Sequence, residues 1–155
     1  MQCFSSKTLH IMYKTNIKDF LFKEARLPLA YSVALLAARI VFGVLFMSHG
    51  VAKWIAFNEM SEHFPDPLGI GSTLSFWLAI FAEIACTFGF MLGALFRLCL
   101  IPMIVTMCTA LFIVHAGDPL PAKELAVIYL TIFVLLFFSG PGRFSIDEML
   151  RRIMA

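Results

Sequence analysis

The pattern of apolar and polar positions divides the chain into four long apolar stretches separated by short polar segments. These stretches cover residues 29–57, 72–96, 98–115 and 124–140. A helix needs about 20 apolar residues to cross the hydrocarbon core of a bilayer. Barrel strands would instead alternate polar and apolar positions over about ten residues, and these runs are longer and more uniform. The pattern therefore predicts an all-α membrane protein, a bundle of four transmembrane helices.

Turn-forming residues stand where the predicted helices end. They are Pro65, Pro67, Gly69 and Gly71 after the first helix, Asp118, Pro119 and Pro121 after the third, and Gly140, Pro141 and Gly142 after the fourth. Proline cannot continue a helix, and glycine is favoured just after a helix ends. The positions of these turn-forming residues thus agree with the hydropathy pattern.

The tail at 141–155 predicts one further helix. Ser145 and Glu148 have the spacing of a capping box, in which each side chain bonds a backbone amide at the helix start. Apolar residues then recur at helical spacing, at Ile146, Met149, Leu150 and Ile153. We expect a short amphipathic helix lying on the membrane surface.

Composition agrees with a lipid environment. Of 155 residues, 61% are hydrophobic and 14% are charged, whereas soluble domains hold about 45–50% and about 25%. The net charge of +2 is small, and the chain has no long basic tract, Gly-rich phosphate loop or zinc-ligand spacing. Nucleic acid is therefore not an expected partner, and the lipid bilayer is.

The distribution of Lys and Arg predicts the orientation. Basic residues occupy the segment 1–28 and the tail 141–155, and Arg97 lies between the second and third helices. The link between the first and second helices, residues 58–71, has no Lys or Arg. Short loops rich in Lys and Arg stay in the cytoplasm. We therefore expect a basic cytoplasmic or interfacial N-terminal segment, both termini inside, and residence in the bacterial cytoplasmic (inner) membrane.

Ionisable residues inside the predicted spans are the candidates for function. They are Arg39, His49 and Lys53 in the first helix, Glu83 in the second, His115 at the outer end of the third and Glu124 at the outer start of the fourth. A charge at the centre of a membrane helix costs at least about 2.5–3.5 kcal/mol on insertion scales. Such residues therefore tend to mark a function or an ion pair.

Helical geometry places three of these groups on one face. At about 100° per residue, Arg39, His49 and Lys53 fall within roughly an 80° arc, beside the small residues Gly43 and Gly50. We expect Glu83 to contact Arg39 or His49, because it is the one carboxylate deep in a predicted helix.

The remaining groups are expected to form a separate outer polar cluster of Lys53, His115 and Glu124. The competing interpretations are structural. Arg39 with Glu83 would then be an ion pair that fixes helix register, and His49 with Lys53 an interfacial anchor. His115 and Glu124 would be ordinary interface residues.

Motifs for metal and redox cofactors are missing from the sequence. The four cysteines form no CxxC, no two histidines are spaced i,i+4, and no haem, flavin or iron–sulfur motif is present. The cysteines are expected to pack as small apolar residues.

Several short motifs, in order, resemble the DoxX family of membrane proteins. They are the stretch from Arg39 to the H-G-x-x-K of His49, Gly50 and Lys53, then Glu83, the G-x-x-x-R of Gly93 and Arg97, Glu124, and the closing G-P-G-x-x-S-x-D from Gly140 to Asp147. The resemblance covers about 39–147 and implies a four-helix bundle. Some members of this family are subunits of a thiosulfate:quinone oxidoreductase, others are linked to complexes that handle thiol stress, and distant relatives are cargo receptors or assembly factors.

The resemblance and the buried charges together suggest a quinone-linked, sulfur- or thiol-related oxidoreductase subunit. In this hypothesis Glu83 and His49 transfer protons. The groups expected to bind a quinone headgroup or an anionic substrate are Arg39, Lys53, His115 and Glu124. The cofactor would be quinone, with a membrane or soluble redox subunit, or a second copy of the chain, as partner. The alternatives are a non-catalytic scaffold or assembly factor, and a small-solute or proton transporter.

Overall fold

Four helices of membrane-spanning length make up most of the protein. The computed structural model describes residues 28–67 and 69–154, so the expected basic segment at 1–28 lies almost wholly outside the described residues. The first span is α3 (Leu29–Ile55), followed by the short α4 (Phe57–Met60). The remaining spans are α5 (Ser72–Phe81) with η1 (Ala82–Cys86) and α6 (Thr87–Leu92), α7 (Phe96–Thr109) with η2 (Ala110–Val114), and α8 (Leu120–Ser139). The predicted architecture is confirmed, and the chain is an integral membrane protein.

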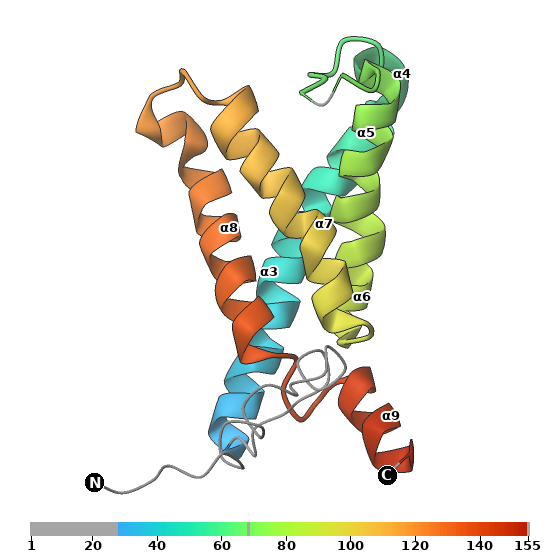
Figure 1. The fold of residues 1–155 in the computed structure, drawn as a ribbon, viewed down its shortest axis with the longest axis vertical. Coiled ribbons are helices and arrows are strands. Elements are labelled where there is room, and N and C mark those ends of the chain that lie inside the picture. Colours follow the sequence, from blue (N-terminus) through green and yellow to red (C-terminus); the bar gives the residue numbers. More distant parts are fainter. Residues whose placement is uncertain (1–27, 68, 155) are drawn as a thin grey trace, which may run out of the picture.

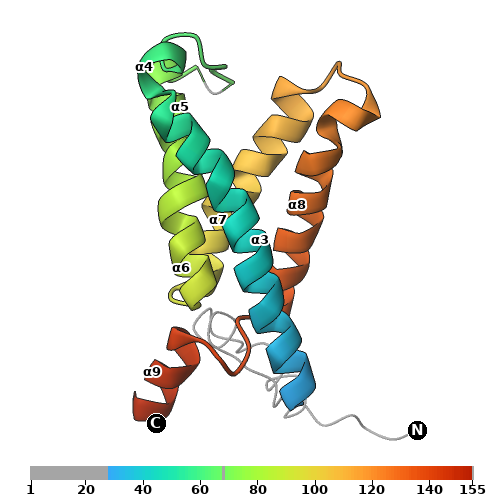
Figure 2. The same ribbon diagram turned by 180° about the vertical axis from the view of Figure 1, so that it is seen from behind.

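The bundle is closed at one end and splayed at the other. Figures 1 and 2 show α7 and α8 diverging from α3 and α5 toward the end that carries α4. At the opposite end, the start of α3, the α6–α7 turn, the end of α8 and the helix α9 (Ile146–Met154) lie together (Figure 1). The first span thus begins, and the fourth ends, at the same end of the bundle. We call these the open end and the closed end.

The closed end is held by one buried guanidinium. Arg39 donates hydrogen bonds to four backbone carbonyls: Phe90 at 3.2 Å, Met91 at 2.6 Å, Pro141 at 2.7 Å and Phe144 at 2.9 Å. Carbonyls in the last turn of a helix have no partner within that helix, and a cation there is favourable. Arg39 therefore joins α3 to the end of α6 and to the turn that follows α8.

Asp147 completes the closed end from the C-terminal segment. Its carboxylate accepts hydrogen bonds from the amides of Leu95 at 2.8 Å and Phe96 at 2.9 Å, at the start of α7. Its own amide donates to the carbonyl of Gly93 at 3.0 Å. Gly93 has a φ of 68°, in the left-handed region that favours glycine. We call the contacts of Arg39 and Asp147 the clamp.

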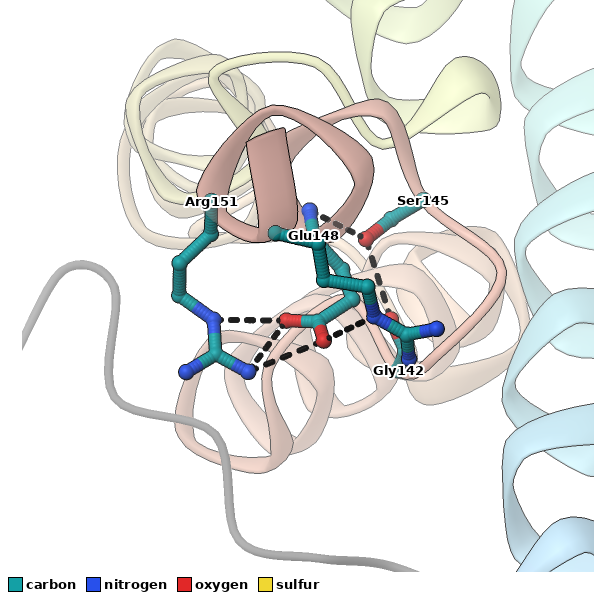
Figure 3. A network of polar contacts seen from close by, with 5 residues as sticks. Gly142, Ser145, Glu148 and Arg151 are labelled. Atoms are coloured by element: carbon teal, nitrogen blue, oxygen red, sulfur yellow. Dashed lines mark hydrogen bonds and ion pairs between the residues drawn. The ribbon is translucent and has the colours of Figure 1, made fainter. Parts of the chain in front are cut away.

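The predicted start of α9 is present in part. The Ser145 hydroxyl accepts the amide of Glu148 at 3.2 Å and donates to the Gly142 carbonyl at 2.9 Å (Figure 3). The Glu148 side chain accepts hydrogen bonds from Arg151 and Arg152.

An aromatic core fills the bundle between the spans. Its fully buried rings are those of Phe46, Phe90, Phe96 and Phe133, with Tyr129 beside them. The rings come from α3, α6, α7 and α8, so the core lies where all four spans approach one another. Toward the open end this packing gives way to the candidate site.

Candidate functional site

An ion pair between α3 and η1 lies at the centre of the site. The Lys53 ammonium donates a hydrogen bond to Glu83 Oε1. The side chain of Glu83 is 1% exposed and that of Lys53 is 26% exposed. Few carboxylates are fully buried without a partner, and Lys53 supplies one oxygen of this carboxylate with its partner.

Gly50 explains why the two charges meet. A Cβ added at Gly50 would lie 2.7 Å from the Cβ of Glu83 and 3.0 Å from its backbone carbonyl carbon. Glycine therefore lets α3 approach η1 much more closely than any other residue would. Lys53 lies one turn further along α3 and so reaches the carboxylate.

Glu83 itself lies in a π-helical turn. η1 interrupts the second span at Ala82–Cys86, and η2 interrupts the third at Ala110–Val114. A π-turn adds a residue to a helical turn, shifts the faces of the helix on either side, and is frequent at functional sites. Both irregular turns contribute to the same pocket.

A pocket of about 400 Å³ separates the second and third spans. Its wall on one side is α5 and η1, and on the other side α7 and η2. Its polar lining consists of Lys53, Glu83, Ser75, Thr106, Thr109 and His115. The rest is apolar, as in most sites for small organic ligands.

The pocket borders the lipid-facing surface. Four of its apolar lining residues are exposed at the surface of the spans: Leu78 and Phe81 on one wall, Val105 and Val114 on the other. In a membrane, exposed side chains at this depth face lipid rather than water. A lipid-soluble molecule can therefore reach the pocket sideways from the bilayer.

A loop borders the pocket at the open end. Phe64, Pro65 and Pro67 belong to its lining. Asp66 anchors this loop by accepting hydrogen bonds from the Ser75 hydroxyl at 2.8 Å and the Gly71 amide at 2.7 Å. The bond from Ser75, followed by those from backbone amides, lowers the pKa of Asp66 below its ordinary value.

His115 lies at the open end of the pocket. Its Nδ1 is 2.7 Å from Oδ2 of Asp118, and the residue lines the same pocket as Lys53 and Glu83. Glu124 is exposed on α8 and lies outside the lining. Of the expected outer cluster, the structure therefore brings Lys53 and His115 to one pocket and leaves Glu124 apart from it.

The expected contact of Glu83 with Arg39 is wrong. The Arg39 guanidinium is taken up by the four carbonyls of the clamp and does not line the pocket. Fourteen residues separate Arg39 from Lys53, which is about 21 Å along a helix. One carboxylate therefore meets only one of the two, and it meets Lys53.

The expected contact of Glu83 with His49 is also replaced by the pair with Lys53. The His49 ring is exposed and packs edge-on against Tyr129, with centroids 6.0 Å apart. His49 is near enough to Glu83 to interact with it electrostatically. It is a neighbour of the carboxylate, whereas Lys53 is its hydrogen-bond donor.

One buried oxygen remains available for a ligand. Glu83 Oε2 is buried and has no hydrogen-bond partner among the described residues. A buried carboxylate oxygen without a partner is costly, so such an atom in a pocket wall favours a ligand that donates a hydrogen bond. In the part of the chain that the structure describes, no three His, Cys, Asp or Glu side chains gather as metal ligands would.

Sequence reasoning missed the hydroxyls of the pocket, Ser75, Thr106 and Thr109. Hydroxyl groups in membrane helices commonly bond the carbonyl of the preceding turn, as Thr106 does with Pro102 at 2.9 Å. Because these hydroxyl groups are uncharged, their cost in a membrane helix is too small to single them out in the sequence. They could be assigned to the pocket only once the structure showed that α5 and α7 face each other across it.

Comparison with known proteins identifies the family. The model of the DoxX family matches residues 34–116, more than half of the chain, including Arg39, Lys53, Glu83 and His115. A protein of Haemophilus influenzae described only as uncharacterized is 24% identical over 129 residues, covering 78% of this chain and 85% of that protein. No solved structure matches the chain. With its four spans and this match, the chain belongs to the DoxX family.

Proposed function

We propose that this DoxX protein is the membrane subunit of a quinone-linked oxidoreductase, and that the pocket beside Lys53 and Glu83 receives a quinone headgroup or an anionic sulfur substrate. The observation that carries the proposal is the unpartnered Oε2 of Glu83 in the wall of a pocket that borders lipid. The same proposal places the protein in the bacterial cytoplasmic membrane, with both termini inside.

The donor and acceptor groups of the pocket suit a quinone in both redox forms. The Lys53 ammonium can donate to a quinone carbonyl or to an anionic oxygen. Glu83 Oε2 can accept from the hydroxyl of a quinol. Hydrogen bonds to charged groups are among the strongest in proteins, and an apolar lining strengthens them further.

A bound quinone would supply the capacity to accept two electrons together with two protons. The electrons come in this proposal from a redox partner subunit, since the chain has no motif for haem, flavin or iron–sulfur. The residues of this chain bind the headgroup and carry protons. Glu83 exchanges protons with the ligand, His49 lies beside it, and His115 with Asp118 connects the outer end of the pocket to water.

Arg39 has no ligand-binding role in this proposal, because the clamp occupies it. Glu124 has none either, because it lies outside the pocket. The candidate ligand-binding set therefore narrows to Lys53, Glu83 and His115.

Binding of a short-chain benzoquinone to the purified protein in mild detergent tests the proposal. We expect Glu83→Gln to weaken binding of its reduced form about tenfold or more, because a hydrogen bond to a charged acceptor is worth about 1.5–3 kcal/mol. Glu124→Gln, which changes an exposed carboxylate outside the pocket, should bind like the wild type. Equal affinity of the Glu83→Gln variant, or no binding by the wild type, would refute the proposal.

Purification from native membranes separates the alternatives. A stoichiometric redox subunit or retained quinone supports the oxidoreductase subunit. A non-redox client whose level falls in the Glu83→Gln variant, with no quinone, would replace it by a scaffold or assembly factor. Solute or proton flux in proteoliposomes of the isolated chain would replace it by a transporter.

A further inference from the structure

A second pocket, at the closed end, carries a separate inference. We infer that the pocket between the end of α6 and α9 binds the phosphate of an anionic phospholipid, with Arg143 and Arg152 as its ligands. This pocket has a volume of about 410 Å³ and shares no residue with the pocket beside Glu83. Its lining consists of Leu92, Arg143, Phe144, Ser145, Ile146, Met149 and Arg152.

The two arginines have donors available. Arg152 uses its Nε to donate to Glu148 Oε1 at 2.7 Å, and no hydrogen bond of its two terminal nitrogens is recorded within the described residues. Arg143 is exposed and has no recorded hydrogen bond in that same part of the chain. An Arg guanidinium matches the geometry of a phosphate and can donate two parallel hydrogen bonds to it.

The charges around the pocket favour an anion. The carboxylate of Glu148 pairs with two arginines, with Arg151 at 2.7 Å (Figure 3) and with Arg152 at 2.7 Å. Arg143 adds a third positive charge beside them. The carboxylate of Asp147 is directed at the amides at the start of α7, and Asp147 does not line the pocket.

Apolar surface next to the arginines identifies the source of the phosphate as a lipid. Leu92, Phe144 and Met149 line the pocket and are exposed. Leu92 also ends the second span, so the pocket lies at the depth of the headgroups. A free phosphate would leave this apolar surface unused, whereas the acyl chain of a phospholipid would cover it.

The clamp holds the pocket in a fixed shape. Asp147, which precedes Glu148, is bound to Leu95 and Phe96 at the start of α7. Ser145 caps α9 through the amide of Glu148. Arg152 is therefore presented from a helix that is anchored to the bundle, and a preorganised site loses little entropy when it binds.

Native mass spectrometry of the purified chain, reconstituted with equal phosphatidylglycerol and phosphatidylcholine, tests this inference. We expect the wild type to retain phosphatidylglycerol preferentially. Arg143→Gln and Arg152→Gln should each lower the ratio of bound anionic to zwitterionic lipid several-fold, because both lipids carry the phosphate but only phosphatidylcholine carries a positive ammonium that an arginine repels. Lys123→Gln, which removes one positive charge at the open end, is the matched control and should keep the ratio.

Two results would overturn the inference. One is an unchanged lipid ratio in the Arg143→Gln variant, whose side chain makes no recorded contact within the described residues and whose loss should leave the fold intact. The other is displacement of the lipid by inorganic phosphate, which would identify a phosphate site and not a lipid site. Because Arg143 is tested alone, the result stands even where Arg152→Gln disturbs α9 through Glu148.

Discussion

The contact of Lys53 with Glu83 supplies a partner to one oxygen of the buried carboxylate and leaves the other oxygen for a ligand. Removing a carboxylate from water is expensive, and Lys53 offsets part of that cost through one oxygen only. The other oxygen stays without a partner in the pocket wall. A purely structural ion pair would gain by satisfying both oxygens, so this geometry is better explained by a ligand that completes the carboxylate.

Single and double substitutions can separate the structural part of this pair from its binding role. Lys53→Met leaves the Glu83 carboxylate buried and uncompensated, and should destabilise the protein by about 2 kcal/mol. The value lies below the 3–5 kcal/mol of fully buried pairs because Lys53 is partly exposed.

The double variant Lys53→Met with Glu83→Leu should recover most of that stability and still fail to bind quinone. Unfolding in detergent, followed by the binding measurement, checks both. A double variant that is as unstable as the single one would contradict the account of an uncompensated charge.

The pairing could not be predicted from the sequence because the sequence does not fix which group of α3 lies level with Glu83. The sequence alone identifies the charged residues in the spans, because a charge is costly to place inside a membrane. Lys53, Glu83 and His115 do line one pocket. Helical geometry at about 100° per residue placed Arg39, His49 and Lys53 on one face of the first helix, but it gave no depth for them relative to Glu83 on another helix. The close approach of α3 to η1 at Gly50 sets that depth and brings Lys53 to Glu83. Arg39 lies on the same face of α3, but it donates its hydrogen bonds to backbone carbonyls of segments far along the chain.

At the scale of elements, the approach of α3 to η1 depends on Gly50. Gly50→Ala should destabilise the protein by about 1–3 kcal/mol, since the added methyl would overlap both the side chain and the backbone of Glu83. Gly117→Ala is the matched control, because nothing lies within 4 Å of a Cβ there. Thermal unfolding of both variants in the same detergent measures the difference, and equal stability would show that the helices adjust freely.

The cap that Asp147 provides for α7 is a contact between elements far apart in the sequence. Asp147→Ala removes the acceptor of two amides at the helix start and should cost about 1–2 kcal/mol, in the upper range for loss of a helix cap. Hydrogen exchange at the amides of Leu95 and Phe96 should rise in this variant. Slow exchange at both amides would mean that other acceptors replace the carboxylate.

The loop beside the open pocket should depend on pH through Asp66. Because the folded state lowers the pKa of Asp66, its contribution to loop stability is full above the ordinary Asp pKa of 3.8 and is lost as the pH falls through the lowered value. Exchange of the Ile70 and Gly71 amides should therefore accelerate in that acidic range beyond the intrinsic effect of pH. Asp66→Asn should abolish this extra dependence, and persistence of it would assign the effect to another group.

At the scale of the whole molecule, the clamp holds the closed end of the bundle together, and the pocket beside Lys53 and Glu83 lies toward the open end. The four-span architecture follows from hydropathy and could be read from the sequence, as could the glycines and prolines that end the helices. The division into a closed and an open end could not, because it depends on backbone carbonyls that any residue type would supply. The family motifs split in the same way. Arg39, Gly93 and the 140–147 segment belong to the clamp, whereas Lys53 and Glu83 belong to the pocket.

The clamp also sets an order of events during synthesis. Arg39 enters the membrane with the first span, but two of its four acceptors, Pro141 and Phe144, are 102 and 105 residues further along the chain. Until the ribosome has made that segment, the guanidinium lacks half of its recorded acceptors. A chain truncated after residue 140 and released into the membrane should therefore be more sensitive to protease than the full chain, although it contains all four spans. The first helix would then be fixed in place only after the segment that follows the fourth span has been made.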